Sequence, residues 1–237
     1  MQGILLPLTA FLTAGFSGIV GFGGAILLLP VLAGTVGVAK AVPILTIIQI
    51  IGNASRVAFA RKEIDWKIAG TYLTTAVPFA MLGAYSFVNA PKALMLKVVA
   101  AAILVFIGLK LSDVNTKPAT GKGLMFAGAI VGYISGLIGT AGPLSAAIFM
   151  SMNLSPLGYI STDAFCSLVM HTAKAIVYKQ SFGCDNLSYS LLITMSLATI
   201  TGTFLGTKIA AHIPKQIFKY AITTLLVCSA LQMLIAA

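Results

Sequence analysis

Charged residues are scarce in this chain of 237 residues, of which 8% are Asp, Glu, Lys or Arg and 59% are hydrophobic. A soluble domain carries about 25% charged residues, so a water-soluble globule of this size could not cover its surface. Acidic residues are especially few, with 5 Asp and Glu in total, and no cluster of Cys, His or Met accompanies them. This shortage argues against a metal centre, and we expect neither a metal nor another cofactor.

Cysteine is also rare. The 3 cysteines are Cys166, Cys184 and Cys228. Their spacing matches neither a disulfide framework nor a metal site, so we interpret them as small apolar residues. The N-terminus has no basic stretch before its first apolar run, and we expect it to belong to the mature fold.

Apolar runs of helical length fill most of the sequence. About 20 such residues are enough for a helix to cross a bilayer, and these runs are unlike the alternating segments of roughly ten residues in an outer-membrane barrel. The expected spans are residues 3–34, 41–60, 68–88, 91–111, 123–150, 161–178, 187–211 and 215–236. The sequence therefore predicts an all-α, multi-pass integral membrane protein. A polar linker at 112–122 separates a first transmembrane repeat (1–111) from a second (123–237).

The charges that are present are mostly positive. The chain has 15 Lys and Arg against 5 Asp and Glu, a formal net charge of +10. In a soluble protein this excess would suggest nucleic-acid binding. In a membrane protein it indicates basic loop residues that meet anionic lipid head groups. We expect the lipid bilayer, and no nucleic acid, as a partner.

The second half of the chain repeats the first. The matching segments are residues 17–24 (SGIVGFGG) with 135–142 (SGLIGTAG) and 53–56 with 171–174, both shifted by 118 positions, and 82–84 with 205–207 and 90–92 with 213–215, both shifted by 123. Four matches in the same order indicate an internal duplication of about four elements per half.

Glycine is concentrated in one segment of each half, at residues 15–24 and 135–142. A glycine inside a helix costs roughly 1 kcal/mol, so this density predicts a helix that stops and restarts. In hydrocarbon, broken backbone is tolerated only beside protein or a water-filled cavity. The alternative is a helix-packing seam of small residues, which explains glycines four apart better than a dense cluster present twice.

A restarting helix turns its first free N–H groups, and the positive end of its dipole, into the break. Two such ends near the middle of the membrane would form an anion site from backbone alone. Discontinuous helices in duplicated halves are the usual sign of a transporter's binding site.

The distribution of Lys and Arg favours one topology. If each glycine segment crossed the membrane, the halves would be parallel and the basic residues would divide nearly evenly. If each is a re-entrant hairpin, one side holds Arg61, Lys62, Lys67, Lys110, Lys117, Lys122, Lys208, Lys215 and Lys219, and the other holds Lys40, Lys92, Lys97 and Lys179. The second arrangement obeys the positive-inside tendency and predicts inverted repeats with both termini outside.

Polar residues follow one face of the span at 41–60 and of its duplicate at 161–178. They are Gln49, Asn53 and Arg56 in the first span and Ser167, His171 and Lys174 in the second. The spacing i, i+4, i+7 puts each set on one helical face. Each cation alone could snorkel to the head groups. Because a cation recurs on the same face in both copies, we predict a cavity that attracts anions.

The ionisable residues of these faces suit different tasks. Arg56 presents a planar fork for two oxygens of an oxyanion, whereas Lys174 is a compact point charge. His171 could carry a coupling proton, or could be a neutral histidine hydrogen-bonded inside the bundle. Asp163 could pair with His171 or cap the start of its helix behind residues 161–162, and we favour the cap.

Two sets of motifs resemble a known family. GFGG at 21–24 followed by PVL at 30–32 resembles the first-repeat signature of the TauE/SafE sulfite exporters, and the repeated LGA/LGT and APK/IPK motifs resemble it too. The likeness extends over essentially the whole chain. It implies a polytopic carrier of the inner membrane that moves sulfite, thiosulfate or organosulfonates such as sulfoacetate. The second glycine segment departs from the pattern, with TAG at 140–142, so we expect two unequal half-sites.

We therefore predict a transporter of small sulfur oxyanions, not an enzyme, whose halves rock around the anion by alternating access, with a proton as a candidate coupling ion. The predicted binding residues are Ser17, Gly21, Gly23, Gly24, Gln49, Asn53, Arg56, Ser135, Gly139, Thr140, Gly142, Ser167, His171 and Lys174. We expect a small anionic substrate as the ligand.

Two other functions fit parts of the pattern. A passive anion channel would also use cations and helix ends. An intramembrane serine hydrolase could use Ser17, within the sequence GFSG, as nucleophile and His171 as base. The hydrolase is disfavoured because Ser17 is duplicated as Ser135, whereas His171 is duplicated as Asn53.

Overall fold

All regular secondary structure in the described part of the chain is helical. The structure is a computed structural model that describes residues 2–36, 38–89, 120–140, 142–182 and 189–214. The helices are α1 (Gln2–Val20), α2 (Gly24–Val36), α3 (Val38–Ala60), the short 3-10 helix η1 (Arg61–Glu63), α4 (Trp66–Asn89), α6 (Lys122–Ile138), α7 (Gly142–Met150), α8 (Pro156–Phe182) and α9 (Tyr189–Ala210). The expected spans at 91–111 and 215–236, residues 112–119 of the expected linker, and Cys184 and Cys228 lie outside the described residues.

Both glycine segments interrupt a helix. The first run stops at Val20 and restarts at Gly24, and the second stops at Ile138 and restarts at Gly142. Gly21 (φ 91°) and Gly139 (φ 84°) follow the two helix ends in the left-handed conformation, which glycine adopts without a steric penalty. The prediction that these helices stop and restart is confirmed, and the packing seam given as the alternative is present as well, at Gly18 and Gly136 of the same segments.

Other glycines form close helix contacts. The most extensive helix pairs are α4 with α6 and α1 with α9. A Cβ atom on Gly83 would lie 3.1 Å from the Cα of Gly136, and one on Gly18 would lie 3.1 Å from the Cα of Gly206. The duplication shifts relate Gly18 to Gly136 and Gly83 to Gly206. The fourth helix of each half therefore packs on the first helix of the other half, through equivalent glycines.

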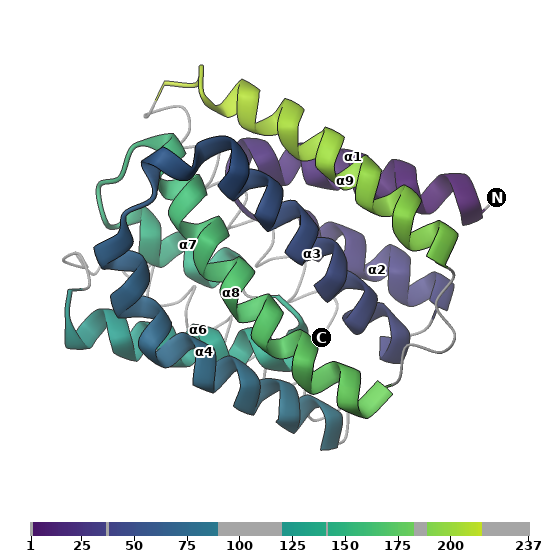
Figure 1. The fold of residues 1–237 in the computed structure, drawn as a ribbon, viewed down its shortest axis with the longest axis horizontal. Coiled ribbons are helices and arrows are strands. Elements are labelled where there is room, and N and C mark those ends of the chain that lie inside the picture. The colour runs from purple at the N-terminus through teal and green to yellow at the C-terminus, as the bar shows by residue number, and fades with distance from the viewer. Residues whose placement is uncertain (1, 37, 90–119, 141, 183–188, 215–237) are drawn as a thin grey trace, which may run out of the picture.

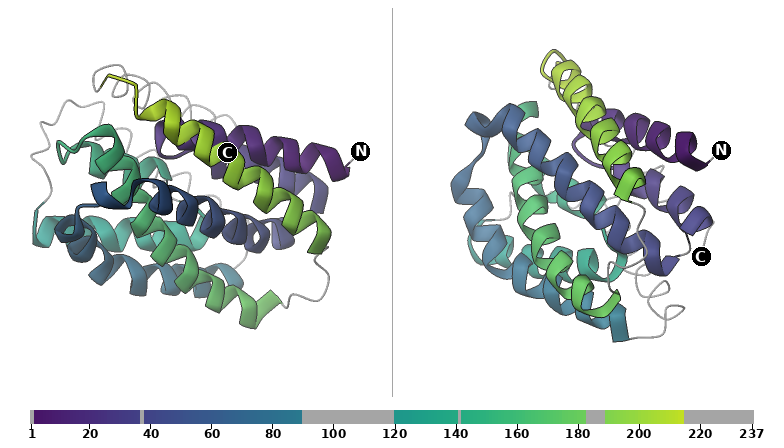
Figure 2. Two further views of the ribbon diagram at one scale, coloured as in Figure 1. Left: turned by 45° about the horizontal axis from the view of Figure 1, so that its top comes forward. Right: turned by 45° about the vertical axis from the view of Figure 1, so that its right-hand side comes forward.

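The helices run between two ends of the molecule, and α3 and α8 pack against each other at its centre (Figure 1). The ends of α3 and α9 and the beginnings of α4 and α6 lie at one end, on the left of Figure 1. The beginnings of α1, α3 and α9 and the ends of α4 and α8 lie at the other, and the views in Figure 2 agree. After the first break the chain turns back, so that α2 runs antiparallel to α1 (Figure 1).

Two large apolar clusters hold the helices together, and a third, smaller one of Val42, Ala84, Phe87 and Tyr178 joins α3, α4 and α8. One is built mainly from α4, α6, α7 and α8 and includes Tyr72 and Phe149, whose ring centroids are 5.0 Å apart. The other is built from α1, α2, α3 and α9 around residues such as Leu32 and Leu45. Each cluster thus combines helices from both halves of the sequence.

The outer surface is apolar. Two helices of the described part are long and apolar enough to cross a membrane, Lys40–Glu63 and Tyr189–Ala210, with mean hydropathies of 1.5 and 1.4. Large apolar side chains such as Ile4, Phe126 and Ile193 are exposed. Contiguous exposed apolar surface is unfavourable in water, whereas it suits contact with lipid chains.

Candidate functional site

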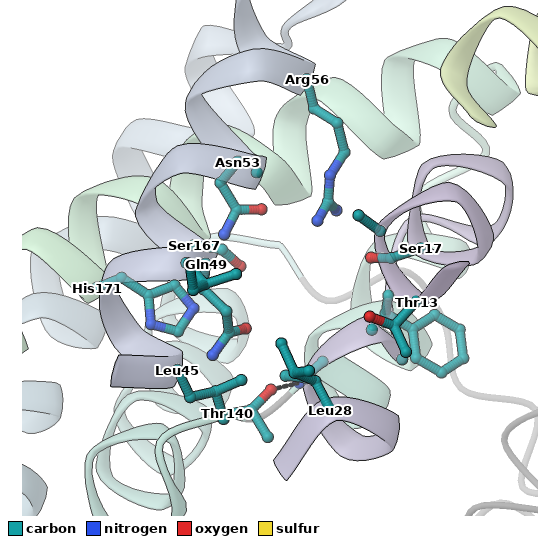
Figure 3. Close-up of a pocket in the computed structure, with 18 of the residues that line it drawn as sticks. Thr13, Ser17, Leu28, Leu45, Gln49, Asn53, Arg56, Thr140, Ser167 and His171 are labelled. Atoms are coloured by element: carbon teal, nitrogen blue, oxygen red, sulfur yellow. Dashed lines mark hydrogen bonds between the residues drawn. The ribbon is translucent and has the colours of Figure 1, made fainter. Parts of the chain in front are cut away.

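A cavity of about 50 Å³ lies where the two helix breaks meet α3 and α8 (Figure 3). One water molecule needs roughly 10–15 Å³ by the same measure, so the cavity has room for an ion of a few heavy atoms. Of the predicted binding residues, those that line the cavity are Ser17, Gly21, Gly23, Gly24, Gln49, Asn53, Arg56, Ser135, Thr140, Gly142, Ser167 and His171. Gly139 and Lys174 are not among the lining residues.

Two helices begin at the cavity wall. Gly24 and Ala25 start α2, Gly142 starts α7, and all three line the cavity. The first N–H groups of a helix have no carbonyl partner within it and carry partial positive charge. The two starts are unequal, because Gly142 N lies 3.5 Å from Thr140 Oγ1 and the next residue, Pro143, has no N–H group. The α2 start therefore offers more donors than the α7 start.

The two buried cations bond to the ends of the helices that stop. Arg56 Nη1 donates to Gly21 O at 2.7 Å, and Lys174 Nζ donates to Gly139 O at 3.1 Å. The duplication shift of 118 relates both the cations and the glycines. A cation stabilises the partial negative charge at a helix C-terminus. Each cation thus closes the end of an interrupted helix, and neither snorkels to the head groups, because Arg56 and Lys174 are both buried.

Arg56 and Lys174 differ in what they leave free. Lys174 Nζ also donates to Ser135 O at 3.0 Å and to Ser135 Oγ at 2.8 Å, and the side chain is fully buried away from the cavity. Arg56 lines the cavity, and its Nε has no hydrogen-bond partner among the described residues. Arg56 therefore retains a donor for a ligand, while the three protons of the Lys174 ammonium group are taken by protein oxygens.

The polar faces of α3 and α8 form one wall of the cavity (Figure 3). Gln49 Nε2 donates to Gly139 O at 3.0 Å, which ties α3 to the second helix break. His171 is buried, and its Nδ1 has no hydrogen-bond partner among the described residues. Ser17 lies across the cavity from His171 in Figure 3, an arrangement that does not pair a nucleophile with a base.

The comparison with known families decides the class of protein. The model of the sulfite exporter family TauE/SafE matches residues 6–233, nearly the whole chain. The chain belongs to the TauE/SafE family. Membership makes it an integral membrane transporter of sulfur-containing anions. No curated protein matches it, and no solved structure does.

One prediction about this TauE/SafE protein is wrong. Asp163 does not cap a helix, because α8 begins at Pro156 and the cap is Ser155, whose Oγ accepts a hydrogen bond from Gly158 N at 3.0 Å. Asp163 lies two turns inside α8, is 2% exposed and lines the cavity. The Ser145 hydroxyl, which donates to Gly142 O at 3.1 Å, lies near the Asp163 carboxyl group, whose Oδ1 has no hydrogen-bond partner among the described residues.

Hydroxyl groups on α9 are a second feature of the TauE/SafE site that the sequence analysis missed. Thr199, Thr203 and Thr207 are buried, and their Oγ1 atoms have no hydrogen-bond partner in the described structure. Thr199 and Thr203 line the cavity. The duplication shift of 123 relates these threonines to three buried alanines of α4, Ala76, Ala80 and Ala84. The sequence shows this difference directly: the helix of the second repeat has a threonine at every fourth position where the helix of the first repeat has an alanine. That pattern could have marked the α9 threonines as candidate site residues.

Proposed function

We propose that this protein carries a small sulfur oxyanion, of the size of sulfite or thiosulfate, through the membrane by alternating access. The observation that carries the proposal is the meeting of two helix starts and a buried arginine, Arg56, in a single cavity. Helix starts bind anions through free N–H groups and the helix dipole. A cavity between interrupted helices is the usual place of a transporter's substrate.

In this proposal the backbone supplies most of the contacts. The N–H groups of Gly23, Gly24 and Gly142 and the hydroxyls of the lining Ser and Thr residues donate to the oxygens of the anion. Arg56 adds its positive charge and the donor left free at Nε. Hydrogen bonds from a charged donor are stronger than neutral ones, so Arg56 is expected to contribute more to affinity than any single hydroxyl.

Lys174 and Gly139 have a different part in the proposal. Because they lie outside the cavity lining, they hold the end of α6 in place and do not touch the anion. The positive charge of Lys174 still reaches the cavity through space, weakened by distance and by the carbonyl oxygens that it binds.

We further propose that the two halves are inverted repeats with re-entrant α1–α2 and α6–α7 hairpins. The swapped pairing of α1 with α9 and of α4 with α6 supports this, as do the helix directions in Figure 1. The described basic residues support it too: Arg61, Lys62, Lys67, Lys122 and Lys208 belong to helix ends on one side, against Lys40 and Lys179 on the other. Because the side with more Lys and Arg residues usually faces the cytoplasm, the beginning of α1 faces the periplasm in this proposal. A protease-cleavable tag before Gln2 should be cut by protease added to spheroplasts, and a tag protected there would refute this orientation.

The transport proposal is tested by uptake of radiolabelled thiosulfate or sulfite into proteoliposomes. Arg56→Gln removes the positive charge from the cavity lining, and Arg61→Gln removes an exposed charge of the same kind. Loss of a charged hydrogen bond costs about 1.5–3 kcal/mol, so we expect uptake by Arg56→Gln to fall by roughly tenfold or more and uptake by Arg61→Gln to stay near that of the wild type. Equal uptake by all three proteins, each inserted in the membrane, would refute the site. Accumulation against the anion gradient separates a carrier from a passive channel.

A further inference from the structure

The charges around the cavity cancel. Among the described lining residues, the ionisable side chains are Arg56, Asp163 and His171, and each is more than nine-tenths buried. With Asp163 ionised and His171 neutral, the positive and negative charges of the lining are equal. Lys174 lies outside the lining, and its charge reaches the cavity only in part, because its ammonium group is turned toward the oxygens of Ser135 and Gly139. An anion that enters therefore meets no net positive charge from the lining side chains themselves unless one of them takes up a proton.

Asp163 is placed to take up that proton. The charged or titratable groups that interact with it are Arg56 from α3, Tyr72 from α4, and Tyr159 and Cys166 from α8 itself. On the remaining side, α7 contributes the hydroxyl of Ser145. Arg56 is the one cation among these groups, and it is also the cation that the anion needs. A carboxylate and an anion in one cavity compete for it and repel each other.

Protonation removes the conflict in two ways. A neutral Asp163 no longer repels the anion, and its O–H group becomes a hydrogen-bond donor. The unpartnered Oδ1 shows that the carboxyl group has an oxygen that no described protein group satisfies. Buried carboxyl groups without full hydrogen bonding favour the neutral form.

We propose that Asp163 couples anion binding to the uptake of a proton, so that each anion crosses the membrane together with a proton. This inference rests on the proposed function, since it requires that the anion binds in the cavity. When the cavity opens, a proton from water bonds to the Asp163 carboxylate as the anion binds. On the other side the anion leaves and the carboxyl group returns the proton to water.

His171 is the other candidate for the coupling proton. It lies one helical turn from Lys174 and faces the same cavity as Arg56. Both neighbours are positive, and like charges disfavour the imidazolium form. The opposite holds for Asp163, because a bound anion repels the carboxylate and therefore favours the protonated carboxyl group.

Calorimetric titration of the purified protein with thiosulfate tests the inference. Thiosulfate stays a dianion near neutral pH, so any proton taken up goes to the protein. Titrations at one pH in buffers of different ionisation enthalpy count the protons. The wild type and Glu63→Gln, which changes an exposed acid outside the cavity, should each take up close to one proton per anion. Their affinity should rise about tenfold for each unit that the pH falls. Asp163→Asn should bind with no proton uptake and little pH dependence, and His171→Gln should still take up close to one proton per anion, whatever its affinity.

The outcomes separate two failures. If the wild type binds thiosulfate without taking up a proton, the coupling inference is wrong and the proposed function stands. The inference is also wrong if Asp163→Asn still takes up a proton, or if His171→Gln loses the uptake. If the wild type binds neither thiosulfate nor sulfite, the proposed function itself fails. The wild-type proton count needs no variant, so it decides the question even if Asp163→Asn does not fold.

Discussion

The unpartnered threonines of α9 predict opposite effects on stability and on binding. Thr199→Val and Thr203→Val keep the shape of the side chain and remove a buried hydroxyl that has no partner among the described residues. An unsatisfied buried hydroxyl costs about 1–3 kcal/mol, so each variant should be more stable than the wild type without ligand, by about 1 kcal/mol. If the hydroxyl donates to a bound anion, its loss should weaken binding by roughly 10- to 100-fold.

Two matched variants sharpen this prediction. Thr207→Val removes an equally unpartnered hydroxyl outside the cavity, so it should raise stability and leave binding unchanged. Thr201→Val removes an exposed hydroxyl that bonds to Leu197 O at 3.0 Å, and it should do neither. Thermal unfolding in detergent and titration with thiosulfate give both quantities. Lower stability of the Thr199 and Thr203 variants, with unchanged affinity, would refute the reasoning.

Three more predictions follow from the helix breaks and the cavity. Gly21→Ala puts a side chain at a φ of 91° and its Cβ 2.5 Å from Tyr159 Cε1, so it should lower the melting temperature. Gly34→Ala has open space around it and should be neutral or stabilising by up to about 1 kcal/mol. Thermal unfolding compares the two variants, and equal melting temperatures would contradict the strained backbone at the first helix break. Lys174→Met removes three hydrogen bonds from the α6 end, two to Ser135 and one to Gly139 O, and should destabilise the protein by about 1–3 kcal/mol. Affinity per folded molecule should change less than in Arg56→Gln, and a larger loss of affinity than of stability would show that Lys174 touches the anion. A cavity of about 50 Å³ should prefer sulfite and thiosulfate to sulfoacetate by about tenfold or more, and competition of unlabelled anions with radiolabelled uptake measures the preference.

The helix breaks could be predicted from the sequence because they depend on local chemistry. Gly21 and Gly139 adopt backbone angles that few other residues accept, and their density and duplication mark the sites. The start of α8 could also have been predicted from the local sequence. Ser155 followed by Pro156 is a typical helix start, with a capping hydroxyl before a proline in the first turn. Attention to that pair would have placed Asp163 inside the helix and kept it among the cavity candidates.

The role of the second cation could not be predicted in the same way. The positions of Arg56 and Lys174 are equivalent in sequence, and both bond to equivalent glycines. Only tertiary packing decides that Ser135 supplies two further acceptors to Lys174, while a donor of Arg56 stays free. Sequence periodicity assigns a residue to one face of a helix, but it does not show how many hydrogen-bond acceptors the neighbouring helix offers to that residue.

The exchange of α4 and α9 between the halves decides which parts of the molecule can move as rigid bodies. With Gly83 against Gly136 and Gly18 against Gly206, neither repeat can separate from the other without opening a tightly packed glycine contact. The natural boundary runs instead between the apolar cluster of α1, α2, α3 and α9 and that of α4, α6, α7 and α8. The chain passes from one body to the other at η1, Arg61–Glu63, and again between α8 and α9, so in the proposed alternating-access cycle the two bodies are joined at these two connections and not through the linker that divides the sequence.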